Sequence, residues 1–179
     1  MFDGQWFEFG MASGECDRLR EWVHRNTVRY NSAMMGEISI RRYQDSDRSA
    51  VSDLWTIVFP DDPPWNEPFE LIQRKKNAQP ELFWIAQQGN QIVGTILAGY
   101  DGVRGWIYHL AVDPSIRRKG VARMLMQTAE AALDALGCAK INLQVRRYNR
   151  EAVAFYKALG YEVEERIQMG KPIGKFRRS

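Results

Sequence analysis

The sequence predicts an α/β fold in which a mixed sheet lies between two layers of helices. Apolar residues alternate with polar ones in several short segments, as in strands, and recur at helical spacing in the segments between them. Clusters of glycine and proline separate these segments. With 179 residues, 45% of them hydrophobic and 26% charged, the chain has the size and composition of one domain with a sizeable core.

The first part of the domain is expected to hold one strand and two helices. Apolar and polar residues alternate from Glu37 onward, which predicts a half-buried strand. Apolar residues then recur at helical spacing over 51–58, which predicts a helix. Four prolines within 60–68 prevent regular hydrogen bonding, so a loop is expected there, followed by a short helix over 69–78.

Three strands are expected in the middle of the chain. The segments 82–87 and 91–98 read as a hairpin, because the Gly-Asn pair between them suits a tight turn. The segment 106–112 is rich in β-prone residues and is ended by an Asp-Pro pair. These strands are expected to form the centre of the sheet.

The last part of the domain is expected to alternate helices and strands. A long apolar stripe predicts a helix over 121–136, and a strand is expected over 141–145. Asn149 can cap a final helix that ends at Gly160, and 161–169 is predicted to be the last strand. The complete order is β-α-α-β-β-β-α-β-α-β, which spreads helices over both faces of the sheet.

The two ends of the chain differ from the domain between them. Residues 1–34 are interpreted as an appendage, the domain as 35–171, and 172–179 as a basic tail. One explanation of the appendage is a start codon assigned too early, because Met35 directly precedes a clean strand. The other is a helix, suggested by apolar spacing over 19–30, that packs on the domain or on a second copy in a homodimer.

The composition narrows the classes of protein to consider. The formal net charge of +3 permits an anionic ligand but does not by itself indicate nucleic acid. Cys16 and Cys138 lie far apart and outside any CxxC motif, so neither a metal nor a disulfide framework is expected. A reducing cytoplasm fits this cysteine usage, and no membrane span or export signal is expected.

A phosphate-binding pattern follows the strand that ends at Val112. A short basic loop with Arg117, Arg118 and Lys119 leads to Gly120 and then to the long helix. The first N–H groups of a helix have no intrahelical partner, the helix dipole is positive there, and glycine lets the backbone approach an anion. Helix N-termini therefore capture phosphate. On these residues alone, a solvated basic loop explains the pattern equally well.

Three segments together carry a more specific resemblance: Leu110-Ala111-Val112-Asp113-Pro114, Arg117-x-x-Gly120-x-Ala122, and a later segment from Asn149 to Tyr156. In this order and spacing they resemble the Gcn5-related N-acetyltransferase (GNAT) superfamily. Its pyrophosphate loop reads Gln/Arg-x-x-Gly-x-Gly/Ala, and its later helix begins at Asn and carries a Tyr. The resemblance spans roughly 37–171. The Ala-Gly-Tyr-Asp-Gly-x-Arg-Gly and Pro-Trp-Asn segments are similar to the YpeA-type subgroup of small bacterial members.

The resemblance implies a GNAT-like three-layer fold whose mixed, mostly antiparallel central sheet is splayed at an acetyl-CoA cleft. The cleft would open between the strands 106–112 and 141–145. It also implies an enzyme that transfers the acetyl group of acetyl-CoA to a primary amine by direct attack in a ternary complex. The cofactor-binding residues that it implies are Leu110, Ala111 and Val112 for the pantetheine arm, and Arg117, Arg118, Lys119, Gly120, Val121 and Ala122 for the pyrophosphate.

Two residues of the later helix receive roles from the same resemblance. Tyr156 would donate a proton to the departing thiolate and contact the cofactor, and Asn149 would hold the cofactor arm while capping its helix. Each has a structural alternative, because Asn is a common N-cap and a Tyr on an apolar helix face often belongs to the core. A backbone N–H near Val112 would face the thioester oxygen, where negative charge develops.

The general base is not fixed by the sequence. An alkylammonium has a pKa of about 10.4 and must lose a proton before it attacks. His109 is a candidate, although a strand histidine is often bonded to its neighbours instead. Glu67, Asp101 or ordered water are alternatives. Relatives that acetylate a ribosomal protein N-terminus carry Glu where this chain has Gln144, which cannot accept that proton.

Two functions from other classes remain as alternatives. Basic residues near 117–119, 146–150 and 175–178 would suit a nucleic-acid-binding module, but they are dispersed and nearly balanced by acids, so no specific nucleic-acid partner is expected. A GNAT-like domain could also sense acetyl-CoA without turnover. The expected partner of the enzyme is a primary amine on a small molecule or a protein.

Overall fold

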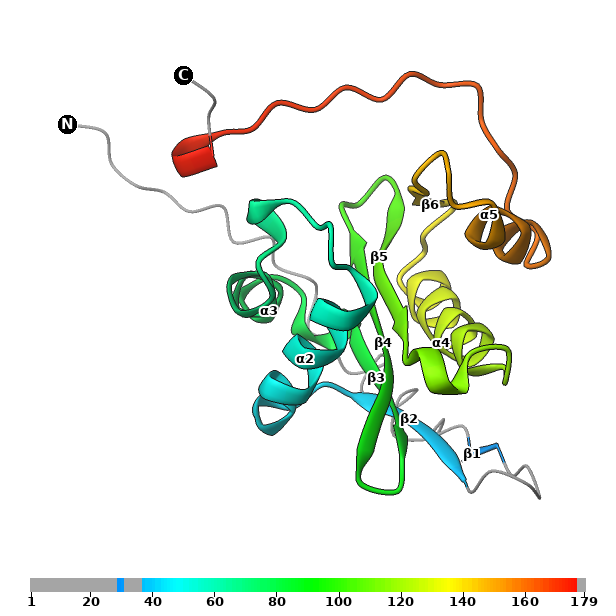
Figure 1. Ribbon diagram of the computed structural model, residues 1–179. Helices are drawn as coiled ribbons and strands as arrows, with labels where there is room; N and C mark the ends of the chain where they lie inside the picture. The colour runs from blue at the N-terminus through cyan, green and yellow to red at the C-terminus, as the bar shows by residue number, and fades with distance from the viewer. Residues whose placement is uncertain (1–28, 31–36, 177–179) are drawn as a thin grey trace.

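A six-stranded sheet runs through the middle of the structure, a computed structural model that describes residues 29–30 and 37–176 (Figure 1). The predicted α/β class is confirmed. In chain order the elements are β1 (Arg29–Tyr30), β2 (Ile38–Arg42), α2 (Arg48–Val58), α3 (Pro68–Asn77), β3 (Phe83–Gln88), β4 (Gln91–Tyr100), β5 (Gly105–Val112), α4 (Val121–Ala135), β6 (Ile141–Leu143) and α5 (Arg150–Lys157).

The strands lie in the order in which they occur in the chain. Neighbours from β1 to β5 are antiparallel, and β6 is parallel to β5. The β5–β6 pairing covers only the first three residues of β5, Gly105 to Ile107, against Ile141 to Leu143. Beyond this point the two strands are not paired with each other, so the sheet is splayed as the sequence predicted.

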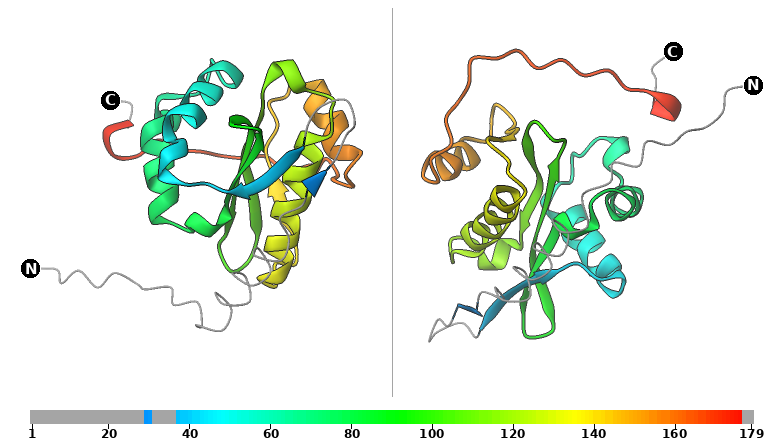
Figure 2. Two further views of the ribbon diagram at one scale, coloured as in Figure 1. Left: turned by 90° about the horizontal axis from the view of Figure 1, so that it is seen from below. Right: turned by 180° about the vertical axis from the view of Figure 1, so that it is seen from behind.

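Helices cover both faces of the sheet, as the predicted three layers require (Figures 1 and 2). On one face, α2 and α3 pack over a cluster that includes Val51, Trp55, Ile72 and Phe83, all at most 2% exposed. On the other face, the apolar stripe of α4 is buried with side chains of β2 to β5, and α5 lies beside α4. Burial of these apolar surfaces is the main stabilising term of such a domain.

The predicted final strand over 161–169 is wrong. In the structure this segment and the residues up to 173 form no regular element, and Figure 1 shows the chain running from α5 to a short turn at Gly174–Phe176. A strand needs a neighbouring strand for its backbone groups, and no described strand pairs with this segment. The apolar side chains of Ile167 and Met169 accordingly remain 93% and 90% exposed.

Most of the proposed appendage, residues 1–28 and 31–36, lies outside the described residues. Of the helical pattern over 19–30, the last two residues form strand β1 and pair with β2. The proposed domain boundaries therefore stay predictions, as does the basic tail, whose last three residues are also outside the described part. No helix within the described residues is long and apolar enough to cross a membrane.

Candidate active site

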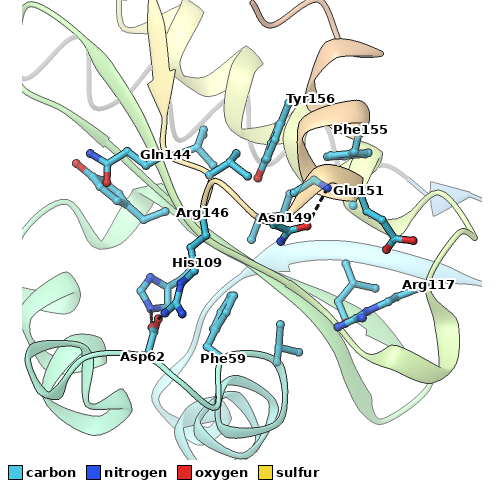
Figure 3. A pocket seen from close by; sticks show the side chains of 18 of the residues that line it. Phe59, Asp62, His109, Arg117, Gln144, Arg146, Asn149, Glu151, Phe155 and Tyr156 are labelled. Atoms are coloured by element: carbon cyan, nitrogen blue, oxygen red, sulfur yellow. Dashed lines mark hydrogen bonds and ion pairs between the residues drawn. The ribbon is translucent and has the colours of Figure 1, made fainter. Parts of the chain in front are cut away.

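A groove of about 1410 Å³ opens where β5 and β6 diverge. The loop between α2 and α3 lines one side of it, and the start of α4, the segment after β6 and α5 line the other (Figure 3). Most of the residues singled out in the sequence lie on this groove: His109, Leu110, Val112, Arg117, Arg118, Gly120, Val121, Ala122, Asn149 and Tyr156. The structure thus brings together residues of β5, α4 with the loop before it, and α5 with its N-cap.

Strand β5 carries a β-bulge at the centre of the groove. The pairing partners shift between Thr95 and Leu97 of β4, so that two residues of β5, His109 and Leu110, lie opposite one residue of β4. His109 has a positive φ of 44°, which fits the extra residue of a bulge. The Thr95 hydroxyl donates to the His109 carbonyl oxygen at 3.4 Å and accepts from the Trp55 indole at 2.7 Å. Buried side chains therefore hold the bulge in place.

The three residues predicted to bind the pantetheine arm alternate across the sheet. Leu110 and Val112 line the groove, whereas Ala111 is fully buried in the cluster under α2. This follows from the two-residue period of a strand. Only the backbone of Ala111 is left to meet a ligand, and the predicted role for this segment is a backbone role.

The N-terminus of α4 opens toward the groove without a side-chain cap. Its N-cap, Gly120, has φ 84° and no side chain, and the first helical bond runs from Met124 N to the Gly120 carbonyl. The N–H groups of Val121, Ala122 and Arg123 therefore have no intrahelical acceptor. A Cβ added at Gly120 would meet no described atom within 4 Å, so an anion can approach this backbone.

The basic residues before Gly120 differ in position. Arg117 lines the groove and its Nε donates to the Val112 carbonyl at 3.4 Å. Arg118 also lines the groove, and its exposed guanidinium lies 3.1 Å from Glu151 of α5. Lys119 is exposed and is not among the described residues that line the groove. Arg117 and Arg118 are thus the better placed to add positive charge beside the helix N-terminus.

Helix α5 contributes Asn149 and Tyr156. The Asn149 Oδ1 accepts from the Ala152 N–H at 3.1 Å, which confirms its predicted cap and leaves its Nδ2 as a donor. Tyr156 is half-buried and packs edge-on against Phe155 and Tyr161. Burial raises the pKa of Tyr156 to about 12, so its hydroxyl is protonated at neutral pH.

His109 lies in a polar contact that the sequence did not reveal. Its Nε2 is 2.9 Å from Asp62 Oδ2, and its ring packs against Trp55 and Phe59. Burial lowers the pKa of His109 below its ordinary value, and the nearby Asp62 carboxylate only partly opposes this. At neutral pH the imidazole is therefore mostly neutral, the form that can accept a proton.

Asp62 also meets Arg146, whose Nη2 is 3.2 Å from its Oδ1. Sequence reasoning assigned neither residue to the site. Asp62 lies in the proline-rich loop, and Arg146 was taken only as part of a dispersed basic cluster. Nothing in either local pattern indicates that the two side chains meet, because the residues are 84 positions apart in the sequence.

The acidic residues that the sequence offered as alternative bases serve as caps. The Glu67 carboxylate accepts from the N–H groups of Phe69 and Glu70 at the start of α3. Asp101 Oδ1 accepts from two N–H groups in the β4–β5 turn. Neither is among the described residues that line the groove, whereas Gln144 is. Among the described residues, no cluster of three or more His, Cys, Asp or Glu side chains could hold a metal ion.

Comparison with known proteins places this chain in a family. The model of the Acetyltransferase (GNAT) family matches residues 48–161. An acetyltransferase of Yersinia enterocolitica is 41% identical over 137 residues, which are 75% of this chain and 94% of the relative. An acetyltransferase of Sodalis glossinidius is 43% identical over 133 residues, which are 73% of this chain and 91% of the relative.

Solved structures share the fold. The aminoglycoside N-acetyltransferase AAC(6′)-Iy in complex with CoA has a TM-score of 0.66 at 18% identity, covering 79% of this chain and 99% of that one. Ard1 from Thermoplasma volcanium has a TM-score of 0.64 at 26% identity, covering 71% and 84%. The chain belongs to the GNAT family and is an acyl-CoA-dependent acetyltransferase. The family predicted from the three sequence segments is confirmed.

Proposed function

We propose that this protein transfers the acetyl group of acetyl-CoA to a primary amine. The observation that carries the proposal is the uncapped N-terminus of α4, which faces the groove between β5 and β6 with its first N–H groups free of intrahelical acceptors. Pyrophosphate would bind there, beside Arg117 and Arg118. A named structural neighbour that binds CoA supports this donor class.

The backbone of β5 would bind the pantetheine arm along Leu110 to Val112. The bulge supports this role, because it interrupts the regular pairing with β4 at His109 and Leu110. A backbone N–H of this segment would face the thioester oxygen and stabilise the negative charge that develops on it. The divergence of the two strands beyond Ile107 of β5 and Leu143 of β6 leaves the space that such an arm requires.

The proposed reaction is a direct attack within a ternary complex. The amine nitrogen attacks the thioester carbonyl carbon, the carbon–sulfur bond breaks, and the sulfur leaves as a thiolate. The protonated hydroxyl of Tyr156 gives its proton to the thiolate, and His109 takes the proton that the amine must lose. The depressed pKa of His109 supports this role, because it keeps the imidazole neutral at neutral pH.

The acceptor would enter over the loop between α2 and α3. Phe59, Asp62 and Trp65 of this loop line the groove near His109. A primary amine on a small molecule or a protein is the proposed acceptor class. One structural neighbour is named as an aminoglycoside acetyltransferase, which fits an amine acceptor. We place the reaction in the cytoplasm on the cysteine usage of the sequence.

The basic residues that suggested nucleic-acid binding are partly paired with acids. Arg118 lies beside Glu151, Arg146 beside Asp62, and Lys175 beside Glu70. This pairing favours the enzyme over a nucleic-acid-binding module, which would present its basic residues to phosphates.

A panel of amines assayed by thiol release from acetyl-CoA tests the proposal. A reaction without amine measures slow hydrolysis of the donor. We expect thiol release to depend on a primary amine and to form its N-acetyl product, detected by mass spectrometry. Binding of acetyl-CoA with no amine-dependent release across small amines, amino acids and peptides would favour an acetyl-CoA sensor instead.

A further inference from the structure

Three charged or titratable side chains from distant parts of the chain meet in the groove. Asp62 comes from the loop after α2, His109 from the bulge of β5, and Arg146 from the segment after β6 (Figure 3). One carboxylate oxygen of Asp62 faces His109 at 2.9 Å, and the other faces Arg146 at 3.2 Å. Asp62 therefore has one oxygen for each partner.

Packing fixes the place of the His109 ring but not which nitrogen carries its proton. Trp55 and Phe59 contact the ring with centroid distances of 4.9 and 5.0 Å, and its side chain is only 12% exposed. An ionised carboxylate can only accept hydrogen bonds, so the Nε2 that faces Asp62 must carry the hydrogen. In the neutral imidazole this leaves Nδ1 with the lone pair that accepts a proton.

We propose that Asp62 is the positioning residue of His109, and that Arg146 ties this pair to the opposite wall of the groove. The proposal rests on the proposed role of His109 as the base. Asp62 selects the tautomer with hydrogen on Nε2 and holds the ring orientation. Its own contact with the substrate is not required, because it acts through His109.

Arg146 makes contacts that suit a tie between two walls. Its Nη2 also donates to the Asp61 carbonyl at 2.9 Å, and its Nη1 donates to the Tyr148 hydroxyl at 2.9 Å. The bonds to Asp61 and Asp62 join the segment between β6 and α5 to the loop after α2, and the Tyr148 bond holds the guanidinium within its own segment. The neighbouring Arg147 is exposed and is not among the described residues that line the groove, which makes it a matched control.

The charges around His109 give the variants opposite expected effects. Asp62 favours the protonated imidazole, and Arg146 offsets part of the Asp62 charge. The uncharged rings of Trp55 in α2 and Phe59 at its C-terminal end pack against the imidazole, and the Thr95 hydroxyl of β4 contacts His109 only at its carbonyl. Asp62→Asn should therefore lower the pKa of His109 further. Arg146→Gln should raise it.

Nitrogen-15 NMR of the imidazole rings tests the proposal without any substrate. The chain has two histidines, His24 and His109, so a His24→Gln variant assigns the signals. We expect the wild type to show the Nε2–H tautomer of His109 at neutral pH, Asp62→Asn to lose this preference and shift the pKa downward, and Arg146→Gln to shift it upward. The control variants Arg147→Gln and Asp53→Asn change exposed residues and should leave the tautomer and the pKa of His109 unchanged.

The acid limb of the pH profile of kcat/KM provides the second readout. Asp62→Asn should lower kcat/KM by roughly tenfold or more and move the acid limb to lower pH, approaching the about 10²-fold loss expected for His109→Gln. Asp62→Glu should restore part of the activity. Unchanged tautomer and pKa in a folded Asp62→Asn variant would overturn the proposal. Failure of acetyl-CoA binding would overturn the proposed function instead and leave the NMR result intact.

Discussion

Helices α4 and α5 both begin at the groove, but only α5 has a side chain that accepts a hydrogen bond from its first N–H groups. At α5 the Asn149 side chain accepts from the Ala152 N–H. At α4 the N-cap is Gly120, which has no side chain to accept such a bond. Helix α3 lies outside the groove and resembles α5 in having a side-chain cap, because the Glu67 carboxylate accepts from two of its first N–H groups.

The difference shows which N-terminus is kept for a ligand. A glycine at the N-cap is only about a few tenths of a kcal/mol less favourable than a capping side chain, so leaving this helix end open costs the fold little. At α4 the first N–H groups have no side-chain acceptor, and two arginines lie beside them. This arrangement suits the binding of an anionic ligand. At α5 the cap is internal, so Asn149 has only its Nδ2 to offer a cofactor.

Gly120→Glu should have the largest effect, because it places a carboxylate where pyrophosphate would bind. We expect acetyl-CoA binding to become undetectable by calorimetry at millimolar concentration, with the circular dichroism spectrum unchanged. The variant also takes a strained left-handed conformation, at a cost of about 1 kcal/mol or more.

Gly89→Glu separates strain from charge in this experiment. Gly89 lies in the β3–β4 turn with φ 56°, and a Cβ there would also meet no described atom within 4 Å. It should show a comparable loss of stability with normal acetyl-CoA affinity. A folded Gly120→Glu variant that binds acetyl-CoA normally would exclude this helix N-terminus as the phosphate site.

Tyr156→Phe should lower kcat by about 10²-fold, a typical contribution of proton transfer, while the affinity for acetyl-CoA changes little. The ring and its packing are kept. Tyr161→Phe is the matched control, because its hydroxyl donates to Glu130 at 2.8 Å on the same side of the fold. It should cost about 1 kcal/mol of stability with near-normal kcat. Wild-type turnover in Tyr156→Phe would remove this residue from the mechanism.

Substitutions of Asn149 separate its cap from its proposed cofactor contact. Asn149→Asp keeps an acceptor oxygen for the Ala152 N–H but removes the Nδ2 donor, so stability should hold while acetyl-CoA binds more weakly. Asn149→Ala should lose both the capping acceptor and the Nδ2 donor, so about 1 kcal/mol of stability should be lost together with acetyl-CoA affinity. Melting temperature and calorimetry measure the two effects on the same samples. Normal acetyl-CoA affinity in both variants would leave Asn149 as a cap alone.

The pH dependence of stability should show the smallest effect. The pKa of His109 is depressed by burial, so on acidification the unfolded state binds this proton first. The free energy of unfolding is therefore highest above the unfolded pKa of about 6.5. It falls as pH decreases through the folded pKa of His109. His109→Gln should therefore flatten urea unfolding stability across this window. If the wild type and His109→Gln showed parallel profiles of unfolding stability against pH, His109 would have the same pKa in the folded and unfolded states.

The sequence predicted the parts of this site that depend on local patterns. The stripe of α4 and the glycine before it are visible in consecutive residues, and the structure places them as expected. The splay of β5 from β6 came from the family resemblance. The predicted strand over 161–169 was wrong, because the residues of one segment do not show whether a partner strand lies beside it.

The contact of His109 with Asp62 could not be predicted from either residue. The two are separated by 47 positions and meet only because the bulge of β5 and the proline-rich loop bring them together. The bulge itself depends on Thr95 and Trp55, which lie on other elements. Such contacts are products of the tertiary fold and leave no periodic signal in the sequence.

Thermal unfolding with two ligands tests the central claim most directly. Acetyl-CoA and S-acetyl-pantetheine share the thioester and the pantetheine arm, but only acetyl-CoA carries the pyrophosphate and the adenosine 3′-phosphate attached to it. Acetyl-CoA at about a hundredfold excess over its Kd should stabilise the wild type by about 2.7 kcal/mol. The fragment at the same concentration should give a far smaller shift. Equal shifts with both ligands, or none with acetyl-CoA, would contradict pyrophosphate binding at the N-terminus of α4.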